Sequence, residues 1–438
     1  MHLLRENLDR PLLCRPLRAV ALLAAFAASS ATLAHEGHPV ADASGLSEVD
    51  TTEDLIESIQ NAITSGTVSL NVRYRQQYAD RRGLEDSLAN TIRTRLGYKT
   101  ADFNGLQGYI ELEDVTAFDD NRYNSTQNGE TERTVIADPE TTELNQLWAS
   151  YQIPLEDIAL SVKGGRQVTN LDDQRFIGSV GWRQDDQVLE AVRVDTDFGI
   201  EGLSALYAYV FEVNRIFAEA GDFDSNSHLI NVAYDIENLG KLTGFIYLLD
   251  FQGSSPENSS QTYGLRLAGK RQLNETFSLA YQGSVAFQED FEDNPEDYDA
   301  EYYLIDLALG VKDIGTIGVG FEVLGSDSGE FAFRTPLATL HKFQGFADLF
   351  LITPDEGVED LYVYFKPANL PFDINAFIAY HLFSGNEDLD TYGQELDIVL
   401  TKKLTNNLSI LGKYASFFGK EPGFEDTTRL TVDLVFKF

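Results

Sequence analysis

Apolar and polar residues alternate with a period of two along most of the chain, from Thr67 to Phe438. The apolar face of the first block is formed by Val68, Leu70, Val72 and Tyr74. That of the last block is formed by Leu430, Val432, Leu434, Phe436 and Phe438. Successive side chains of a strand point to opposite sides, so this period predicts β-strands with one apolar and one polar face. The blocks are about ten residues long, which is the length that a tilted strand needs to cross a bilayer.

The strands of a soluble β-sandwich also alternate apolar and polar residues. Three further features favour a membrane barrel over such a sandwich. Tyr and Phe recur at the ends of the apolar faces, where membrane barrels carry interfacial girdles. Long acidic connections alternate with tight ones, which fall at Asn104-Gly105, Pro154–Asp157, Asn238–Gly240 and Thr405–Asn407. The last strand closes on an aromatic residue, as is common in outer-membrane barrels. We therefore expect an all-β protein, a transmembrane antiparallel β-barrel in a bacterial outer membrane.

The number of strands follows from parity. A direct count gives nineteen alternating segments, but a barrel with both ends in the periplasm needs an even number. Counting back from the end makes 367–371 a periplasmic turn, and counting forward makes the stretch after Leu324 extracellular. Both counts agree if 325–357 is one long excursion, whose segment Phe343–Ile352 lacks clean alternation. We expect eighteen strands around an aqueous lumen.

Residues 1–34 are predicted to be a cleaved signal peptide. Four arginines precede the apolar run Ala19–Ala28, which is too short to span a bilayer, and Thr32-Leu33-Ala34 offers a cleavage site. Cys14, the single cysteine, lies in this segment, so no disulfide is expected in the mature protein.

Residues 35–66 are expected to form a periplasmic segment before the barrel domain, 67–438. A helix can begin at Thr51, with its apolar residues on one face: Leu55, Ile56, Ile59 and Ile63. We expect this helix at the barrel rim, and a lumenal plug is the alternative. The segment is too short for the plug domain of a gated receptor.

The charge balance is strongly acidic and argues against nucleic-acid binding. The net charge is -37, and because residues 1–34 carry four arginines and two carboxylates, the mature value is -39. Disorder is also disfavoured, because 43% of the residues are hydrophobic and 11% aromatic. Eight carboxylates lie within Glu289–Glu301, an expected extracellular loop. They could approach lipopolysaccharide through divalent cations, or could simply be solvated.

Arginines occupy the polar face of the first two blocks, at Arg73, Arg75, Arg93 and Arg95. Facing lipid at mid-depth, each would cost about 2–4 kcal/mol, so they must face the lumen. Arg193 lies on the polar side of a later block. Two interpretations stay open. The arginines guide anions by bidentate binding of carboxylates, or they are solvated lining, balanced by Glu111 and Glu113.

Two long connections are expected to narrow the pore. Gly164-Gly165 predicts a bulge that turns Arg166 inward. The loop that follows is dense in opposite charges, with Asp172, Asp173, Arg175 and Arg183. The second connection, 325–357, contributes Phe343 and Phe346. An ordinary surface loop is the alternative for the first connection.

The remaining chemistry is sparse, and we expect no cofactor, no metal site and no enzymatic activity. Asp222, Asp224 and Asn226 resemble the start of a calcium loop, but Ala233 stands where its bidentate Glu should be. His35 and His38 are interpreted as part of a flexible end. The other histidines, His228, His341 and His381, lack the sequence context of a hydrolase triad.

Several runs resemble the alginate-export family of outer-membrane porins. The most specific is Gly165–Gln184, with GRQ, LDDQRFIG and GWRQ; others are Thr91–Tyr98, Glu143–Gln146 and Thr335–Leu340. The resemblance covers nearly the whole mature chain. It implies an eighteen-stranded barrel and a passive channel for an anionic polysaccharide or oligosaccharide. Its partners would be outer-membrane lipid and lipopolysaccharide, small anions and a periplasmic export or uptake protein. A small-solute porin is the alternative, and a barrel enzyme a remote one.

Overall fold

The computed structural model describes residues 52–218, 221–253, 255–387 and 390–438. The expected signal peptide and most of segment 35–66 lie outside this range. The strands that form the barrel wall in the described residues are β1 (Thr67–Arg81), β2 (Ser87–Lys99), β3 (Leu106–Ala117), β4 (Thr141–Pro154), β5 (Ala159–Gln167), β6 (Val188–Thr196), β7 (Leu203–Asn214), β8 (Phe223–Ile236), β9 (Gly240–Leu249), β11 (Ser260–Gln272), β12 (Phe277–Asp290), β13 (Asp299–Val311), β14 (Gly315–Leu324), β17 (Val358–Pro367), β18 (Asn375–Ser384), β19 (Thr391–Lys403), β20 (Leu408–Gly419) and β21 (Thr427–Lys437).

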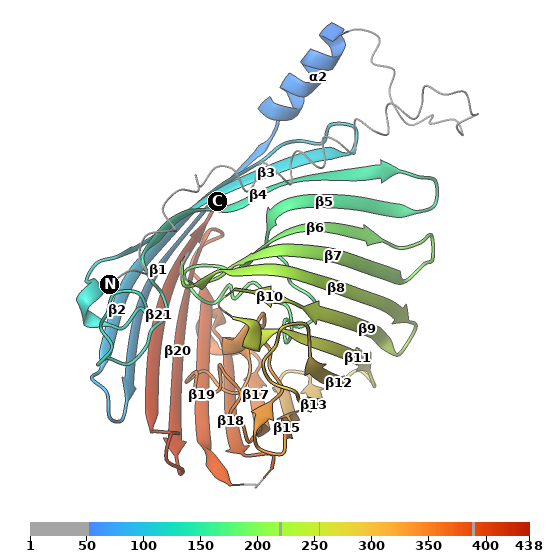
Figure 1. The fold of residues 1–438 in the computed structure, drawn as a ribbon. Coiled ribbons are helices and arrows are strands. Elements are labelled where there is room, and N and C mark those ends of the chain that lie inside the picture. The colour runs from blue at the N-terminus through green and yellow to red at the C-terminus, as the bar shows by residue number, and fades with distance from the viewer. Residues whose placement is uncertain (1–51, 219–220, 254, 388–389) are drawn as a thin grey trace.

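These eighteen strands form one closed antiparallel barrel (Figure 1). Each strand pairs with its neighbour in the chain, and β1 closes the ring against β21, with Asn71 opposite Lys437 and Arg81 opposite Thr427. The two-residue strand β10 (Phe251–Gln252) extends the sheet beside β8. The predicted strand number and antiparallel order are confirmed.

The excursion at 325–357 contains no spanning strand. Its regular elements are the small hairpin β15–β16 (Ser326–Asp327 and Phe331–Ala332) and the helical turn Leu340–Lys342. β14 pairs directly with β17 across the excursion, Gly315 opposite Pro367 and Leu324 opposite Val358. The parity argument is therefore confirmed, because Phe343–Ile352 does not cross the membrane.

The barrel has apolar side chains on its outer surface and polar side chains inside, which is the reverse of the arrangement in a soluble protein. Outward apolar side chains are exposed, for example Leu96 at 52% and Ile317 at 57%, whereas inward polar side chains are buried, with Arg75 at 0%. Lipid covers the outer face of a membrane barrel, so an exposed apolar exterior is the expected state. Tight turns join the strands at one end. At Asn104-Gly105 both residues have positive φ, of 51° and 88°, which is the conformation that a two-residue hairpin requires.

The expected bulge at Gly164-Gly165 was wrong. β5 keeps an unbroken register with β4 and β6 through both glycines. Register shifts occur on other strands, for example where Asn145 of β4 and Phe211 of β7 are skipped in the pairing. Gly165 instead allows close approach, because its φ is +123° and an added Cβ would meet the Leu147 carbonyl at 2.2 Å.

The predicted helix is present as α2 (Thr52–Thr64) and leads into β1. It projects from one end of the barrel and does not enter the lumen (Figure 1). The Tyr98 hydroxyl and the Ala101 amide donate to its last carbonyls, those of Ile63 and Ala62. The apolar residues on its face stay 38–55% exposed. Among the described residues, no helix is both long and apolar enough to cross a membrane.

Candidate functional site: the loops inside the barrel

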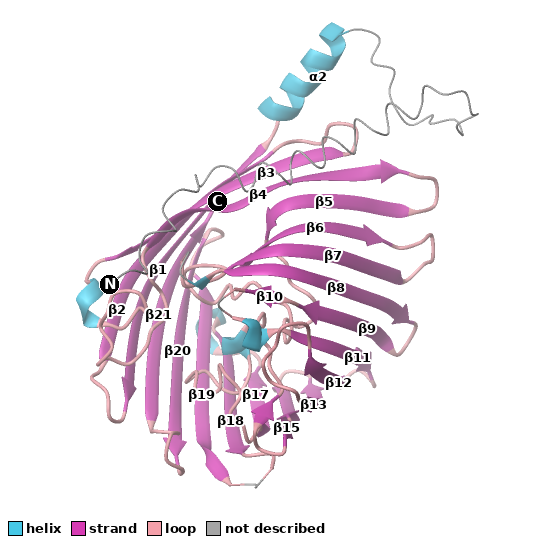
Figure 2. Ribbon diagram, in the orientation of Figure 1, coloured by secondary structure: helices cyan, strands magenta, loops and turns pink. Residues whose placement is uncertain are grey.

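Two long loops fold into the ring of strands and contact each other. We name them the β5–β6 loop (168–187) and the β14–β17 loop (325–357) (Figure 2). The Gly178 amide donates to the Leu337 carbonyl at 2.8 Å, and the Thr339 amide donates to the Gln174 carbonyl at 3.0 Å. The lumen is therefore crossed by a structure that both loops build together.

Apolar side chains hold this structure against the inner wall. Leu171 and Ile177 from the first loop are buried in one cluster with Phe333, Leu337 and Phe350 from the second, and the wall contributes aromatic residues that include Phe245, Tyr302 and Phe383. Phe176 packs against Phe245 with ring centroids 4.9 Å apart and against Tyr302 at 5.2 Å. Burial of aromatic surface is a strong stabilising contribution, so the loops have a defined position.

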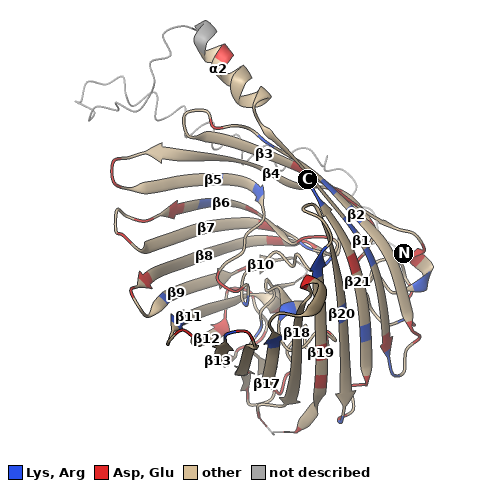
Figure 3. Cartoon of the chain, turned by 180° about the vertical axis from the view of Figure 1, so that it is seen from behind, with Lys and Arg blue, Asp and Glu red and all other residues tan. Residues whose placement is uncertain are grey.

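The four arginines of β1 and β2 lie close together because Arg73 is directly opposite Arg93. Figure 3 shows basic and acidic positions along these strands and β21. Arg73 donates to the carbonyls of Gly181, Trp182 and Arg183, each at 3.0 Å. Its guanidinium group therefore holds the end of the β5–β6 loop against the wall.

The arginine patch consists of Arg73, Arg75, Arg93 and Arg95. The last three contact the end of the β5–β6 loop and also bind side chains of the wall or of other loops. Arg75 bonds Asp433 of β21 at 2.8 Å and Asp138 at 3.3 Å, and lies over the Trp182 ring. Arg93 donates to Asn71 at 2.9 Å and to the Gln184 carbonyl at 3.4 Å. Arg95 pairs with Glu113 and, at 2.6 Å, with Asp186. Each group is engaged by protein atoms.

The remaining expected arginines are also paired. Arg166 bonds Glu190 at 2.7 Å, and Arg175 bonds Glu322 of β14 at 2.7 Å. Arg183 links the two loops through Asp348 at 2.9 Å. Arg193 pairs with Asp195 two positions along its own strand and keeps 24% of its side chain exposed, compared with 2–3% for Arg175 and Arg183. Arg193 is therefore far more accessible to a solute than either loop arginine.

The expected pore-loop residues tie the loops to several strands. Asp172 accepts hydrogen bonds from Asn231 of β8 and Thr243 of β9, at 2.8 and 3.2 Å, and Asp173 pairs with Arg266 of β11 at 3.4 Å. On the second loop, Phe343 lies under the Arg175 guanidinium at 4.7 Å. The Phe346 amide donates to Asp397 of β19 at 3.2 Å.

A buried polar centre that sequence reasoning missed lies where the loops meet. The His341 ring stacks on Trp182 at 4.2 Å and bonds Asp348 at 2.6 Å. Lys413 of β20 lies 2.8 Å from the other ring nitrogen of His341. The alternation of β20 places Lys413 on the inner face, but no sequence signal joins it to a histidine 72 positions earlier.

The electrostatics of this centre favour a neutral His341. Burial lowers the pKa of His341 to about 3, although Asp348 acts in the opposite direction. For Asp348, burial would raise the pKa, but His341, Arg183 and Arg429 outweigh it and hold the pKa well below its ordinary value. The centre therefore contains a carboxylate held by two guanidinium groups and by a neutral imidazole.

The cavities of the described residues include two between the inner loops and the wall, and one of about 730 Å³ at the ends of β12–β14 that is lined by Glu289, Asp299, Glu301 and Glu359 among others. The β5–β11 cavity has a volume of about 540 Å³ and is lined by Arg193, Lys241, Arg266, Asp172 and Asp195 among others. The β12–β18 cavity, of about 300 Å³, is lined by Lys342, Lys366, Phe343, Tyr362 and Tyr364 among others. Both also contain carboxylates, which are Asp172, Asp195 and Asp197 in the first cavity and Asp306, Glu322 and Asp360 in the second. Each cavity therefore offers cationic and anionic groups side by side to a polar solute.

Comparison with known proteins gives one family and one fold. The family model for alginate export matches residues 66–302. Solved structures with the same fold include OccK1 (OpdK) of Pseudomonas aeruginosa, at 12% identity and a TM-score of 0.67, covering 86% of this chain and 99% of that one. OccAB2 of Acinetobacter baumannii has 11% identity, a TM-score of 0.67 and the same coverage. OccK11 (OpdR) of P. aeruginosa has 15% identity, a TM-score of 0.61 and coverage of 86% and 97%. No curated protein matches.

The family match spans more than half of the chain and includes the β5–β6 loop, with the wall strands β1 and β2 that hold it. The fold is that of outer-membrane porins, which confirms the resemblance and the expected location. The chain is an outer-membrane barrel channel and belongs to the alginate export family.

Proposed function

We propose that this channel passes a carboxylate-bearing saccharide of the alginate type through the space that its two inner loops leave open. The observation that carries the proposal is the lining of the two cavities, where Arg193, Lys241 and Arg266 face one and Lys342 and Lys366 face the other. Guanidinium groups bind carboxylates bidentately, and aromatic rings offer a flat apolar surface to a sugar ring. The family match supports the same class of solute.

The expected arginines take two different roles in this proposal. Arg73, Arg75, Arg93 and Arg95 act on the solute through the loop that they hold, because their donors bind the loop or acidic side chains. Arg193 contacts the solute directly, together with Arg266 across the β5–β11 cavity. Arg166, Arg175 and Arg183 keep the loops in place through their ion pairs.

A second candidate, uptake of small anions, is favoured by the size of the cavities. Volumes of about 540 and 300 Å³ are those of small-molecule sites, and the loops are fixed by buried ion pairs. One barrel of similar fold, OpdK of P. aeruginosa, has been crystallised with vanillate; it is 12% identical, with a TM-score of 0.63. An enzymatic role is not proposed, because in the described residues His228, His341 and His381 hydrogen-bond Tyr207, Asp348 with Lys413, and Asp360, and no serine or cysteine nucleophile is among these partners.

The test is block of the ionic current in planar bilayers. Oligouronates of increasing length should reduce the current of the wild type, and neutral oligosaccharides of equal length should not. Arg193→Ala and Arg266→Ala should each weaken the oligouronate block several-fold. Arg271→Ala is the matched control, because it removes the same charge from the outward alternation of β11, which carries the exposed Tyr263 and Leu265.

Block by short anions but not by longer oligouronates would favour the small-solute channel. Equal block by charged and neutral sugars would contradict a role for the cationic lining. If Arg271→Ala weakened the block as much as Arg193→Ala, the lumen cavity would not be the binding site.

A further inference from the structure

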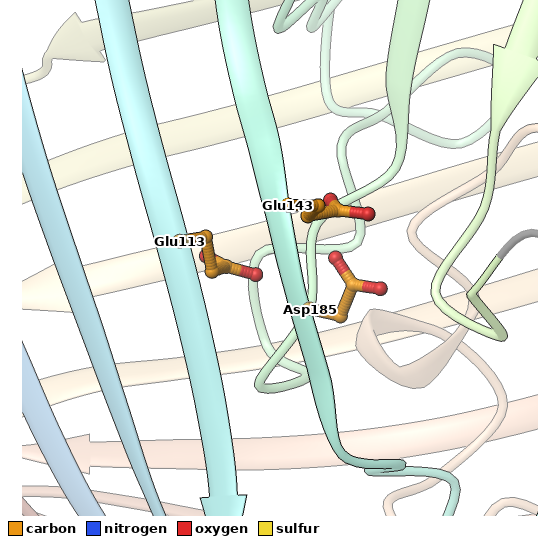
Figure 4. A group of neighbouring side chains, drawn as sticks. All are labelled: Glu113, Glu143 and Asp185. Atoms are coloured by element: carbon orange, nitrogen blue, oxygen red, sulfur yellow. The ribbon is translucent and has the colours of Figure 1, made fainter. Parts of the chain in front are cut away.

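Three carboxylates from distant parts of the sequence meet at the junction between the β5–β6 loop and the wall. Glu113 lies on β3, Glu143 on β4 and Asp185 near the end of the loop (Figure 4). One oxygen from each lies within 4.8 Å of the others. Glu113 and Glu143 are directly opposite in the register of the two strands. Like charges in that position repel, so the arrangement is unfavourable unless a cation is present.

The buried oxygens of this cluster lack hydrogen-bond donors. Asp185 is 1% exposed, and neither of its carboxylate oxygens meets an N–H or hydroxyl donor; the groups beside them are the carboxylates of Glu113 and Glu143. Glu113 is also 1% exposed, and its Oε1 has no partner, because Arg95 bonds the other oxygen. Native proteins rarely bury a carboxylate without a donor or a counter-ion. These two groups are aimed at the same point as Glu143.

The nearby guanidinium groups do not supply the missing partners. Arg95 is shared between Glu113 and Asp186, and Asp186 keeps one buried oxygen without a partner. Arg166 is bonded to Glu190. Arg93 bonds neither Glu113 nor Asp186 but lies close enough to act on both through its charge, so four carboxylates face two guanidinium groups and leave two formal negative charges.

We propose that Glu113, Glu143 and Asp185 bind a divalent cation of the Ca²⁺ class, which fastens the β5–β6 loop to strands β3 and β4. Hard divalent cations prefer oxygen ligands, and the cluster offers only carboxylates. Two oxygens bound to one Ca²⁺ lie at most twice the Ca²⁺–oxygen distance of about 2.3–2.6 Å apart, so mutual separations within 4.8 Å are compatible with one shared ion. Glu143 is only half-buried, so water from the lumen can complete the coordination.

The site has no signature in the sequence, because its ligands lie 30 and 42 positions apart and match no calcium-loop spacing. The inference is independent of the solute that passes through the channel. It assigns the loop a second means of attachment beside the arginines of β1 and β2. Removal of the cation should therefore loosen the loop without unfolding the barrel.

The experiment is calorimetric titration of Ca²⁺ into the full chain, refolded in detergent and freed of metal with EDTA at neutral pH. The wild type should bind one Ca²⁺ per chain, more tightly than Mg²⁺. Asp185→Asn and Glu143→Gln should weaken this binding at least tenfold. Asp297→Asn and Glu292→Gln are matched controls in the exposed acidic loop and should leave it unchanged.

A second readout is the channel itself. EDTA should raise the current noise or conductance of the wild type and leave Asp185→Asn unaffected, with Ca²⁺ restoring the wild type alone. Glu143→Gln serves if Asp185→Asn does not fold. The proposal is overturned if the wild type shows no saturable Ca²⁺ binding, or if both variants bind Ca²⁺ as it does. In the first of these cases, variants at least as stable as the metal-free wild type would indicate that the three carboxylates share protons instead of a cation.

Discussion

At the scale of single residues, the inner face of this barrel behaves like a protein interior. Arg75 is 0% exposed and lies between Asp433 and Asp138, while its plane covers the Trp182 ring at 4.2 Å. The Arg75 guanidinium group therefore makes its hydrogen bonds to fixed protein partners and not to water. Removing it takes the bonded counter-charge from two buried carboxylates, which is more costly than the loss of the pair itself.

Arg75→Ala should therefore reduce the free energy of unfolding by about 3–5 kcal/mol. Arg82→Ala is the control, because Arg82 is 68% exposed and pairs with Asp426 at the surface. An exposed pair contributes about 0–1 kcal/mol. Urea unfolding in lipid vesicles measures both variants. Equal effects would contradict the view that the arginine patch is a buried structural anchor.

At the scale of elements, the two inner loops are held as one unit by the centre around His341. Burial lowers the pKa of His341 to about 3, from an ordinary value of about 6.5. In the unfolded chain the imidazole of His341 is thus protonated below about pH 6.5, whereas in the folded chain it stays neutral down to about pH 3. The contribution of His341 to stability is complete above pH 6.5 and falls as the pH decreases through this window.

The contribution of His341 to this slope is up to about 1.4 kcal/mol of unfolding free energy per pH unit between pH 6 and pH 5, measured as the difference between the wild type and His341→Gln. His341→Gln should flatten it, because glutamine can still donate to Asp348 but does not titrate. His228→Gln, on β8, is the control and should keep the wild-type slope. A slope that persists in His341→Gln would assign the pH dependence to other groups.

The loop itself can be tested by shortening it. Replacing 338–350 with a short Gly-Ser linker removes the contacts with Gln174 and Arg183 and should raise single-channel conductance several-fold. Shortening the acidic loop by 292–296 is the control and should have little effect, because its carboxylates are exposed. Unchanged conductance after the first deletion would exclude a constricting role for the β14–β17 loop.

At the scale of the whole molecule, the net charge and the charge of the lumen predict opposite ion selectivities. The chain carries -37, yet lysine and arginine side chains face both lumen cavities. At about 0.15 M salt the screening length is about 8 Å, so acidic extracellular loops have little influence on a constriction deep in the barrel. Lumen charge governs selectivity.

The channel should therefore prefer anions. The reversal potential across a salt gradient in planar bilayers measures this preference, and Arg193→Ala with Arg266→Ala should shift it toward cations. A wild type that prefers cations would contradict the proposal, because Asp172, Asp195 and the other carboxylates of the lumen would then dominate the field.

The alternation of apolar and polar residues was sufficient to predict the strands of the barrel wall from the sequence alone. Alternation is a property of each strand by itself, so the faces, the eighteen strands and the excursion at 325–357 could all be predicted from residues close together in the chain. The positions of inward groups such as Arg73 and Arg93 followed in the same way. The bulges did not, because a register shift depends on how two strands pair rather than on one glycine pair.

The interior was decided only by the tertiary structure. Whether Arg73 binds a solute or the carbonyls of Gly181 and Trp182 depends on where a loop more than a hundred positions away folds. The same holds for His341 with Lys413, and for Glu113 with Asp185. The barrel closes a ring, so it brings residues from every strand around one lumen, and the energies of buried charges depend on distances that only this closure sets.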